Sequence, residues 1–96
     1  VAISASPVQP VTGANELRLY VFKGMGTPVT GATIAVEPWM PGHGHGSTEV
    51  PVVDEDGGGW YTVSNVFYTM PGYWELSIDI DDSVDVDSVT FEYDVQ

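Results

Sequence analysis

The sequence contains no cysteine and only two basic residues, Arg18 and Lys23. Without cysteine, a disulfide framework, a thiolate zinc site and a cysteine nucleophile are excluded. No apolar run approaches the ~18 residues that a membrane-spanning helix needs, and no charged-then-apolar leader is recognisable at Val1. We therefore expect no membrane segment within the chain and leave open a membrane tether upstream of Val1.

Acidic residues dominate the charge. Fourteen Asp and Glu residues give a net charge of −12, and from Glu75 onward the chain has acids and no base. Such a surface repels nucleic acid and anionic membranes, which excludes both as partners. It attracts cations and basic proteins. A solvated surface that keeps the protein soluble is the simplest interpretation of this charge.

Apolar residues recur mainly with the period of two that is typical of a β-strand. Leu17, Leu19 and Val21 form one such series, and no window combines a helical period with helix caps. We expect a single domain over residues 1–96. The expected strands lie at residues 1–12 (a leader and edge strand), 16–22, 32–36, 49–53, 60–68, 73–80 and 89–95.

Glycine, proline and acidic residues mark the connections between these strands. We expect Pro38 to end its strand, residues 54–59 to form a turn, and residues 81–87 to form an acidic loop. About seven short strands with this spacing predict an all-β fold, an immunoglobulin-like antiparallel β-sandwich. Because successive antiparallel strands reverse direction, the loops at residues 40–48 and 69–72 should share one end. The loop with Met25 and the acidic loop should share the other end.

The loop at residues 40–48 holds both histidines of the protein, in the run Met40-Pro41-Gly42-His43-Gly44-His45-Gly46. In an extended backbone, residues i and i+2 project to the same side, so His43 and His45 can face one metal ion. Imidazole suits copper, zinc and nickel, and a thioether selects Cu(I). Met40 precedes the histidines, and Met70 belongs to a second Met-Pro-Gly at the same expected end. A structural or disordered loop is the competing interpretation.

Three further residues are candidates for a supporting role around this site. Trp39 and Trp74 could exclude solvent and offer ring faces to a cation. Glu49 could complete a Cu(II) site together with the two histidines. Packing in the core or at its rim is the simpler role for either tryptophan, and gap filling is the simpler role for the methionines.

Several motifs together resemble the YtkA-like (FixH/YtkA-type) domain family, over roughly residues 15–80. The resemblance implies an extracytoplasmic immunoglobulin-like sandwich, periplasmic, secreted or at the cell surface, that is associated with copper handling. By position it implies Met40, His43, His45 and Met70 as ligands of Cu(I). The motifs are Gly31-Ala32-x-Ile34-x-Val36, Pro38-Trp39-Met40-Pro41-Gly42-His43-Gly44-His45-Gly46-Ser47, Pro51, Gly59-x-Tyr61-x-Val63 and Phe67-x-x-Met70-Pro71-Gly72-x-Trp74-x-Leu76.

The expected function is therefore a copper carrier, metallochaperone or buffer that docks to a basic patch on a copper donor or acceptor protein. The alternative is a non-catalytic structural or interaction module of a surface or secreted protein. A third interpretation, calcium binding by the acidic loop, lacks the glycine that an EF-hand loop needs at its sixth position, where Val86 stands. We do not expect an enzyme, because the serines have no suggestive histidine partner and the carboxylates cluster in an exposed segment.

Overall fold

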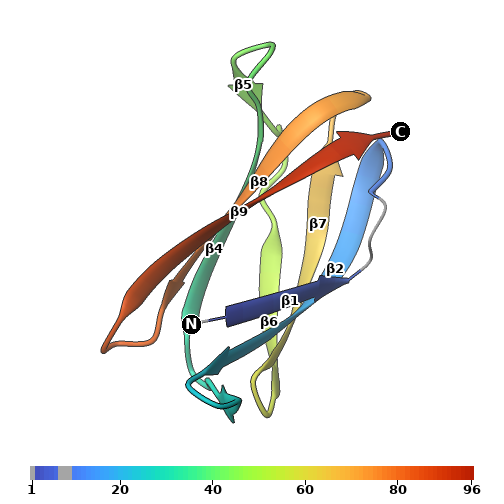
Figure 1. Ribbon diagram of the computed structural model, residues 1–96. Helices are drawn as coiled ribbons and strands as arrows, with labels where there is room; N and C mark the ends of the chain where they lie inside the picture. Colours follow the sequence, from blue (N-terminus) through green and yellow to red (C-terminus); the bar gives the residue numbers. More distant parts are fainter. Residues whose placement is uncertain (1, 7–9) are drawn as a thin grey trace.

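Two antiparallel sheets pack face to face in the computed structural model, which describes residues 2–6 and 10–96 (Figure 1). The first sheet has the strand order β1-β2-β7-β6, with β3 paired to β2. The second sheet has the order β5-β4-β8-β9. The strands are β1 (Ala2–Ser6), β2 (Gly13–Lys23), β3 (Thr27–Pro28), β4 (Thr33–Met40), β5 (His45–Gly46), β6 (Val52–Gly57), β7 (Trp60–Tyr68), β8 (Gly72–Asp81) and β9 (Val86–Val95).

This strand order is that of a constant-type immunoglobulin domain. Without the two-residue strands β3 and β5, four strands form one sheet and β4, β8 and β9 form the other, as in the ABED and CFG sheets of that fold. The predicted all-β class and immunoglobulin-like sandwich are confirmed. The predicted leader strand is also an edge strand, since β1 pairs only with β2 among the described residues; residues 7–9 of the leader lie outside the described part.

The alternating side chains of the two sheets meet in one core. Leu17, Leu19 and Val21 of β2 face inward and are buried, and so are Leu76 and Ile78 of β8. Each such side chain contributes ~1.5–3 kcal/mol by leaving water. The period of two therefore placed the core face of these strands correctly.

Some strand boundaries differ from the prediction. Residues 49–53 were expected to be a strand and 54–56 a turn, but β6 begins at Val52 and continues through these acids. The reversal occurs at Gly57, Gly58 and Gly59, all with positive φ. Only glycine adopts these angles without strain, so the three glycines set the turn, and the exposed acids remain on the strand.

Two further strand boundaries also differ from the prediction. Pro38 was expected to end its strand, yet β4 runs through it to Met40. Proline is tolerated where its nitrogen faces the open edge of a sheet. The acidic loop is shorter than predicted, because β8 continues through Asp81 and β9 begins at Val86. β-Pairing between the two strands outweighs the low strand preference of aspartate.

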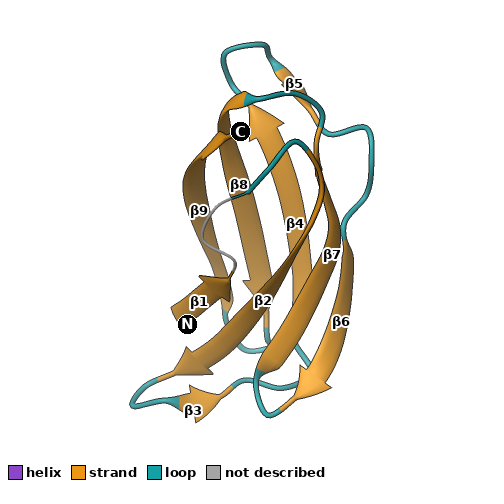
Figure 2. Cartoon of the chain, turned by 90° about the vertical axis from the view of Figure 1, so that its right-hand side faces the viewer, coloured by secondary structure: helices purple, strands orange, loops and turns teal. Residues whose placement is uncertain are grey.

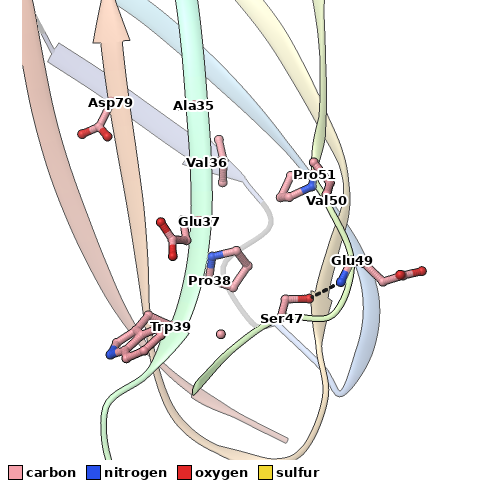
Figure 3. A pocket seen from close by; sticks show the side chains of 11 residues that line it. Ala35, Val36, Glu37, Pro38, Trp39, Ser47, Glu49, Val50, Pro51 and Asp79 are labelled. Carbon is pink, nitrogen blue, oxygen red and sulfur yellow. Dashed lines mark hydrogen bonds between the residues drawn. The ribbon is translucent and has the colours of Figure 1, made fainter. Parts of the chain in front are cut away.

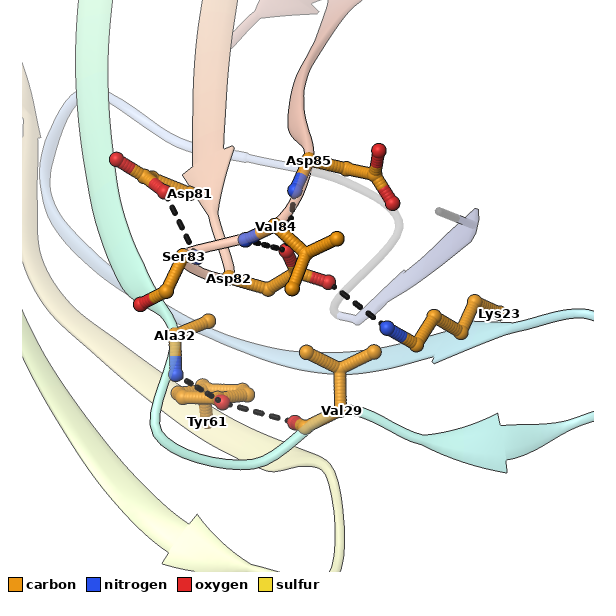
Figure 4. Close-up of polar contacts among 9 residues, drawn as sticks. All are labelled: Lys23, Val29, Ala32, Tyr61, Asp81, Asp82, Ser83, Val84 and Asp85. Atoms are coloured by element: carbon orange, nitrogen blue, oxygen red, sulfur yellow. Dashed lines mark hydrogen bonds and ion pairs between the residues drawn. The ribbon is translucent and has the colours of Figure 1, made fainter.

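The loops separate to the two ends of the sandwich as strand parity predicts (Figure 2). At one end, the Lys23 ammonium lies 3.1 Å from the Asp82 carboxylate and joins the end of β2 to the β8–β9 loop (Figure 4). At the other end, the β4–β5 hairpin lies against the start of β8. No helix among the described residues is long and apolar enough to span a membrane.

Candidate metal centre

The β4–β5 hairpin sets the position of both histidines. The Met40 carbonyl accepts hydrogen bonds from the amides of His43, at 3.2 Å, and Gly44, at 3.0 Å. Gly44 has a φ of 65°, which glycine adopts without the penalty of a Cβ. The tight turn brings His45 directly opposite Met40 in the β4–β5 pairing. Directly paired residues of antiparallel strands present their side chains on the same face, so His45 and Met40 share one face.

The His45 ring is fixed by its neighbours. Its Nδ1 lies 3.1 Å from the Gly46 carbonyl oxygen, which can only accept a hydrogen bond, so the contact favours the tautomer with hydrogen on Nδ1. That tautomer leaves the lone pair of Nε2 available for a metal. The ring also meets Trp74 edge-on, with the centroids 5.9 Å apart. His45 is half-buried, whereas His43 is exposed.

The two imidazoles are close enough to share an ion. Their ring centroids are 5.7 Å apart, a separation that one nitrogen of each ring and two metal–nitrogen bonds of ~2.0–2.1 Å can span. Among residues 2–6 and 10–96, no group of three or more His, Cys, Asp or Glu side chains could hold a metal. A further soft side-chain ligand beside the histidines would therefore be a methionine, since the sequence has no cysteine.

The second Met-Pro-Gly loop lies against the hairpin. A Cβ built on Gly72 would lie 2.6 Å from the Met40 terminal methyl, so this methyl packs on the bare Gly72 backbone. Trp74 donates a hydrogen bond from Nε1 to the Met70 carbonyl at 2.9 Å. Met70 itself is partly buried against the core. Residues 40 and 70–72 are thus brought to one place, as strand parity predicts.

Trp74 joins the hairpin, the second loop and the core. It is fully buried, its indole N–H bonds to the second loop, and its ring contacts His45. On the core side it meets Tyr68 edge-on, with centroids 5.2 Å apart. Burial raises the pKa of the Tyr68 hydroxyl well above its usual value, so this ring stays neutral. Trp74 therefore supports the His45 ring from the core side.

Two of the sequence candidates, Trp39 and Glu49, lie away from this contact, and so does Met25, as strand parity predicts. Trp39 is 38% exposed and, as the neighbour of Met40 in β4, faces the opposite side of the strand. Glu49 is exposed on the segment after β5, where its amide bonds to the Ser47 hydroxyl (Figure 3). Met25 is fully exposed at the tip of the β2–β3 hairpin, at the other end of the sandwich.

The acidic loop uses its carboxylates to build its own turn. Asp81 accepts a hydrogen bond from the Ser83 amide, and Asp82 accepts bonds from the amides of Val84 and Asp85 (Figure 4). These backbone bonds, followed by the bond from Lys23, lower the pKa of Asp82 to about 2. The carboxylates of Asp81 and Asp82 are therefore engaged within the loop.

Of the residues that contribute to this end of the molecule, Gly72 was the least expected from the sequence. Gly72 has a φ of 132°, and the Met40 methyl packs directly against its backbone. In the sequence it was only a turn glycine, because a contact between residues 40 and 72 has no local signal. The repeated Met-Pro-Gly was the one pattern that pointed to it.

The fold and the two loops define an immunoglobulin-like β-sandwich with histidines and methionines gathered at one end. The YtkA-like family profile matches residues 1–79, and the chain belongs to the YtkA-like family. Neither the curated proteins nor the solved structures contained a match.

Proposed function

We propose that this protein is an extracytoplasmic copper carrier that binds one copper ion as Cu(I) between its two Met-Pro-Gly loops. The observation that supports this is the contact of the Met40 methyl with Gly72, two residues after Met70. It sets the Met40 side chain against the loop that carries Met70, at the end of the sandwich where His43 and His45 lie. Membership of the YtkA-like family adds support.

The proposed ligands are His43, His45, Met40 and Met70. Imidazole and thioether donors suit Cu(I), which prefers soft ligands. The hydrogen bond of His45 Nδ1 to the Gly46 carbonyl orients Nε2 as the donor. Cu(I) binding draws Met40 outward from its present core position, which is 4% exposed, and methionine has the rotatable bonds for such a change.

Delivery to a partner follows from the same ligands. His43 is exposed, and a partner's ligands can replace the imidazole and thioether donors one at a time. The net charge of −12 favours docking to a basic patch on a copper donor or acceptor protein. The copper in this proposal is cargo, and the protein performs no catalysis.

A competition titration with Cu(I) and a chromophoric chelator, under anaerobic conditions, tests the proposal. We expect His43→Ala and His45→Ala each to weaken binding by at least about tenfold, equivalent to ~1.4 kcal/mol. Met40→Leu and Met70→Leu keep the apolar volume and remove the sulfur, and each should also weaken binding. Met25→Leu, at the other end of the sandwich, is the matched control and should leave the affinity unchanged.

Acidification gives a second readout. A histidine must lose its proton to bind a metal, so Cu(I) affinity should fall as pH decreases in the wild type. The fall should be shallower in the double variant His43→Ala/His45→Ala. Unchanged Cu(I) affinity in both single histidine variants would overturn the proposal and leave the alternative, a structural or interaction module. Binding of Zn(II) without binding of Cu(I) would assign the site to a different metal.

A further inference from the structure

The edge of the second sheet is open along most of β4. Among the described residues, β5 pairs with β4 only at Trp39 and Met40, and the chain then leaves toward β6. Between β4 and this departing segment lies a groove of about 460 Å³ (Figure 3). One side of the groove is β4 from Ala35 to Trp39, and the other side is the segment from Gly46 to Pro51.

The backbone of β4 offers hydrogen-bonding groups to this groove. A Cβ on Gly46 would lie 3.1 Å from the Pro38 carbonyl oxygen, so this carbonyl faces the β5 side. In a strand, the N–H and C=O of a residue point to one edge, and those of its neighbours point to the other edge. Val36 and Ile34 therefore direct their N–H and C=O groups to the open edge. Pro38 has no N–H to donate at this edge, but its carbonyl can still accept a hydrogen bond.

The two faces beside this edge differ in chemistry. Toward the core, Val36 and Pro38 lie across the groove from Pro51 and form an apolar side (Figure 3). On the outer face, Glu37 is exposed, and Asp79 lies on the neighbouring strand β8, opposite Ala35. Glu49 stands on the far side of the groove, and no Lys or Arg is among the described residues that line it. A strand added here would meet apolar groups inside and carboxylates outside.

We propose that the open edge of β4 binds an extended segment of a partner protein, which adds as an antiparallel strand along residues 33–37 and alternates basic with apolar residues. The apolar side chains cover the half-buried Val36, and the basic side chains lie over Glu37 and Asp79. Strand addition of this kind gains affinity from main-chain hydrogen bonds and specificity from alternate side chains. Opposite charges on directly paired residues stabilise such a pairing. The edge and groove are present without a metal, so the inference is independent of copper binding.

A second copy of this chain is disfavoured at the same edge. Two β4 strands paired edge to edge would bring Glu37 of each copy close to the acids of the other, and the net charge of −12 on each copy adds to the repulsion. Acidic side chains at a free edge are a common protection against such self-pairing. A basic partner segment would not be repelled in this way. We therefore assign the open edge of β4 to a basic partner.

The test is titration calorimetry of the metal-free protein with the peptide acetyl-Lys-Val-Lys-Val-Lys-Val-amide. A block peptide, acetyl-Lys-Lys-Lys-Val-Val-Val-amide, has the same charge and composition without the alternation. We expect the alternating peptide to bind at least about tenfold more tightly, equivalent to ~1.4 kcal/mol. Equal binding of the two peptides would show that net charge alone attracts them and would overturn the proposal.

N-methylation of the peptide backbone tests the geometry. In an antiparallel pair, the residue opposite Val36 exchanges hydrogen bonds with it and shares its inward face. The valine amides of the peptide should therefore bond to β4, and the lysine amides should face away. Methylation of the backbone amide nitrogens of the valines should abolish binding. Methylation of the backbone amide nitrogens of the lysines should leave binding nearly unchanged. If the valine-methylated peptide binds as tightly as the lysine-methylated peptide, or more tightly, the proposed antiparallel pairing is wrong.

Two charge reversals separate the groove from the rest of the acidic surface. Glu37→Lys should weaken binding of the alternating peptide about fivefold, since an attractive pair becomes repulsive. Glu16→Lys, an exposed position on the first sheet, changes the net charge equally and should have a much smaller effect. Thermal melts confirm that both variants fold. Equal weakening by the two reversals, or self-association of the chain through this edge, would refute the assignment.

Discussion

The terminal methyl of Met40 packs against Gly72, at a point where a Cβ on residue 72 would come within 2.6 Å of it. Residue 40 ends β4, and residue 72 begins β8. This contact connects the histidine hairpin to the second Met-Pro-Gly loop. Gly72 is therefore sensitive to substitution for two separate reasons. Its φ is 132°, and a Cβ would meet the Met40 methyl.

Gly72→Ala should destabilise the fold by ~1–3 kcal/mol, through overpacking against Met40 and backbone strain. Chemical denaturation with matched m-values measures this cost. Gly42→Ala is the control in the neighbouring loop, because a Cβ there meets no atom within 4 Å and its φ is not positive. In the Met40→Ala background, Gly72→Ala should cost less, because only the backbone strain remains. An equal cost in both backgrounds would show that the methyl contact contributes nothing.

Tyr61→Phe should lower the free energy of unfolding by ~1–3 kcal/mol, since it leaves two backbone groups without a partner. The buried Tyr61 hydroxyl donates to the Val29 carbonyl at 2.8 Å and accepts from the Ala32 amide at 3.2 Å (Figure 4). Tyr20→Phe is the matched control, because its hydroxyl makes one exposed contact of 3.4 Å with the Gly26 carbonyl. The control should change stability by less than ~0.5 kcal/mol. Similar values for the two variants would contradict the role of Tyr61.

Asp82 should make stability depend on pH at the acid end. Its folded-state pKa is about 2, against an ordinary value of 3.8, so the folded state favours the carboxylate. This contribution is present above pH 3.8 and is lost as pH falls toward about 2. The difference in stability between wild type and Asp82→Ala should therefore shrink over this range.

Carboxyl chemical shifts in an NMR titration measure the Asp82 pKa directly. Because the amides of Asp85 and Val84 are the larger causes of the shift and Lys23 is a smaller one, Lys23→Met should raise the pKa only part of the way to its ordinary value. Complete recovery in that variant would mean that the ion pair, and not the turn, lowers the pKa.

Trp74 should report copper binding by fluorescence. Its ring lies edge-on to His45, with the centroids 5.9 Å apart, so copper bound at this imidazole lies close to the indole and should quench its emission. The double variant Trp39→Phe/Trp60→Phe leaves Trp74 as the only tryptophan. One equivalent of copper should quench this variant strongly, and His45→Ala should remove the effect. Quenching no greater than that of free N-acetyltryptophanamide would place the metal elsewhere.

Local sequence patterns were sufficient to predict the strand faces, the fold class and the end of the molecule at which each loop lies. These depend on local rules: alternation along β2 and β8 selects the core face, and chain reversal at each turn assigns the loops to ends. Thus His43, His45, Met40 and Met70 could be assigned to one end before any contact was known. Met25 could be assigned to the other end in the same way.

The folded structure was needed to show which atoms meet at that end and where the sheet stays open. The Met40–Gly72 contact and the Trp74–Met70 hydrogen bond join separate loops, and the open edge of β4 exists because the chain leaves after Gly46. The same is true of β4 continuing through Pro38, which depends on the edge that its nitrogen faces. Such features arise from packing between distant segments, and local residue patterns carry no information about them.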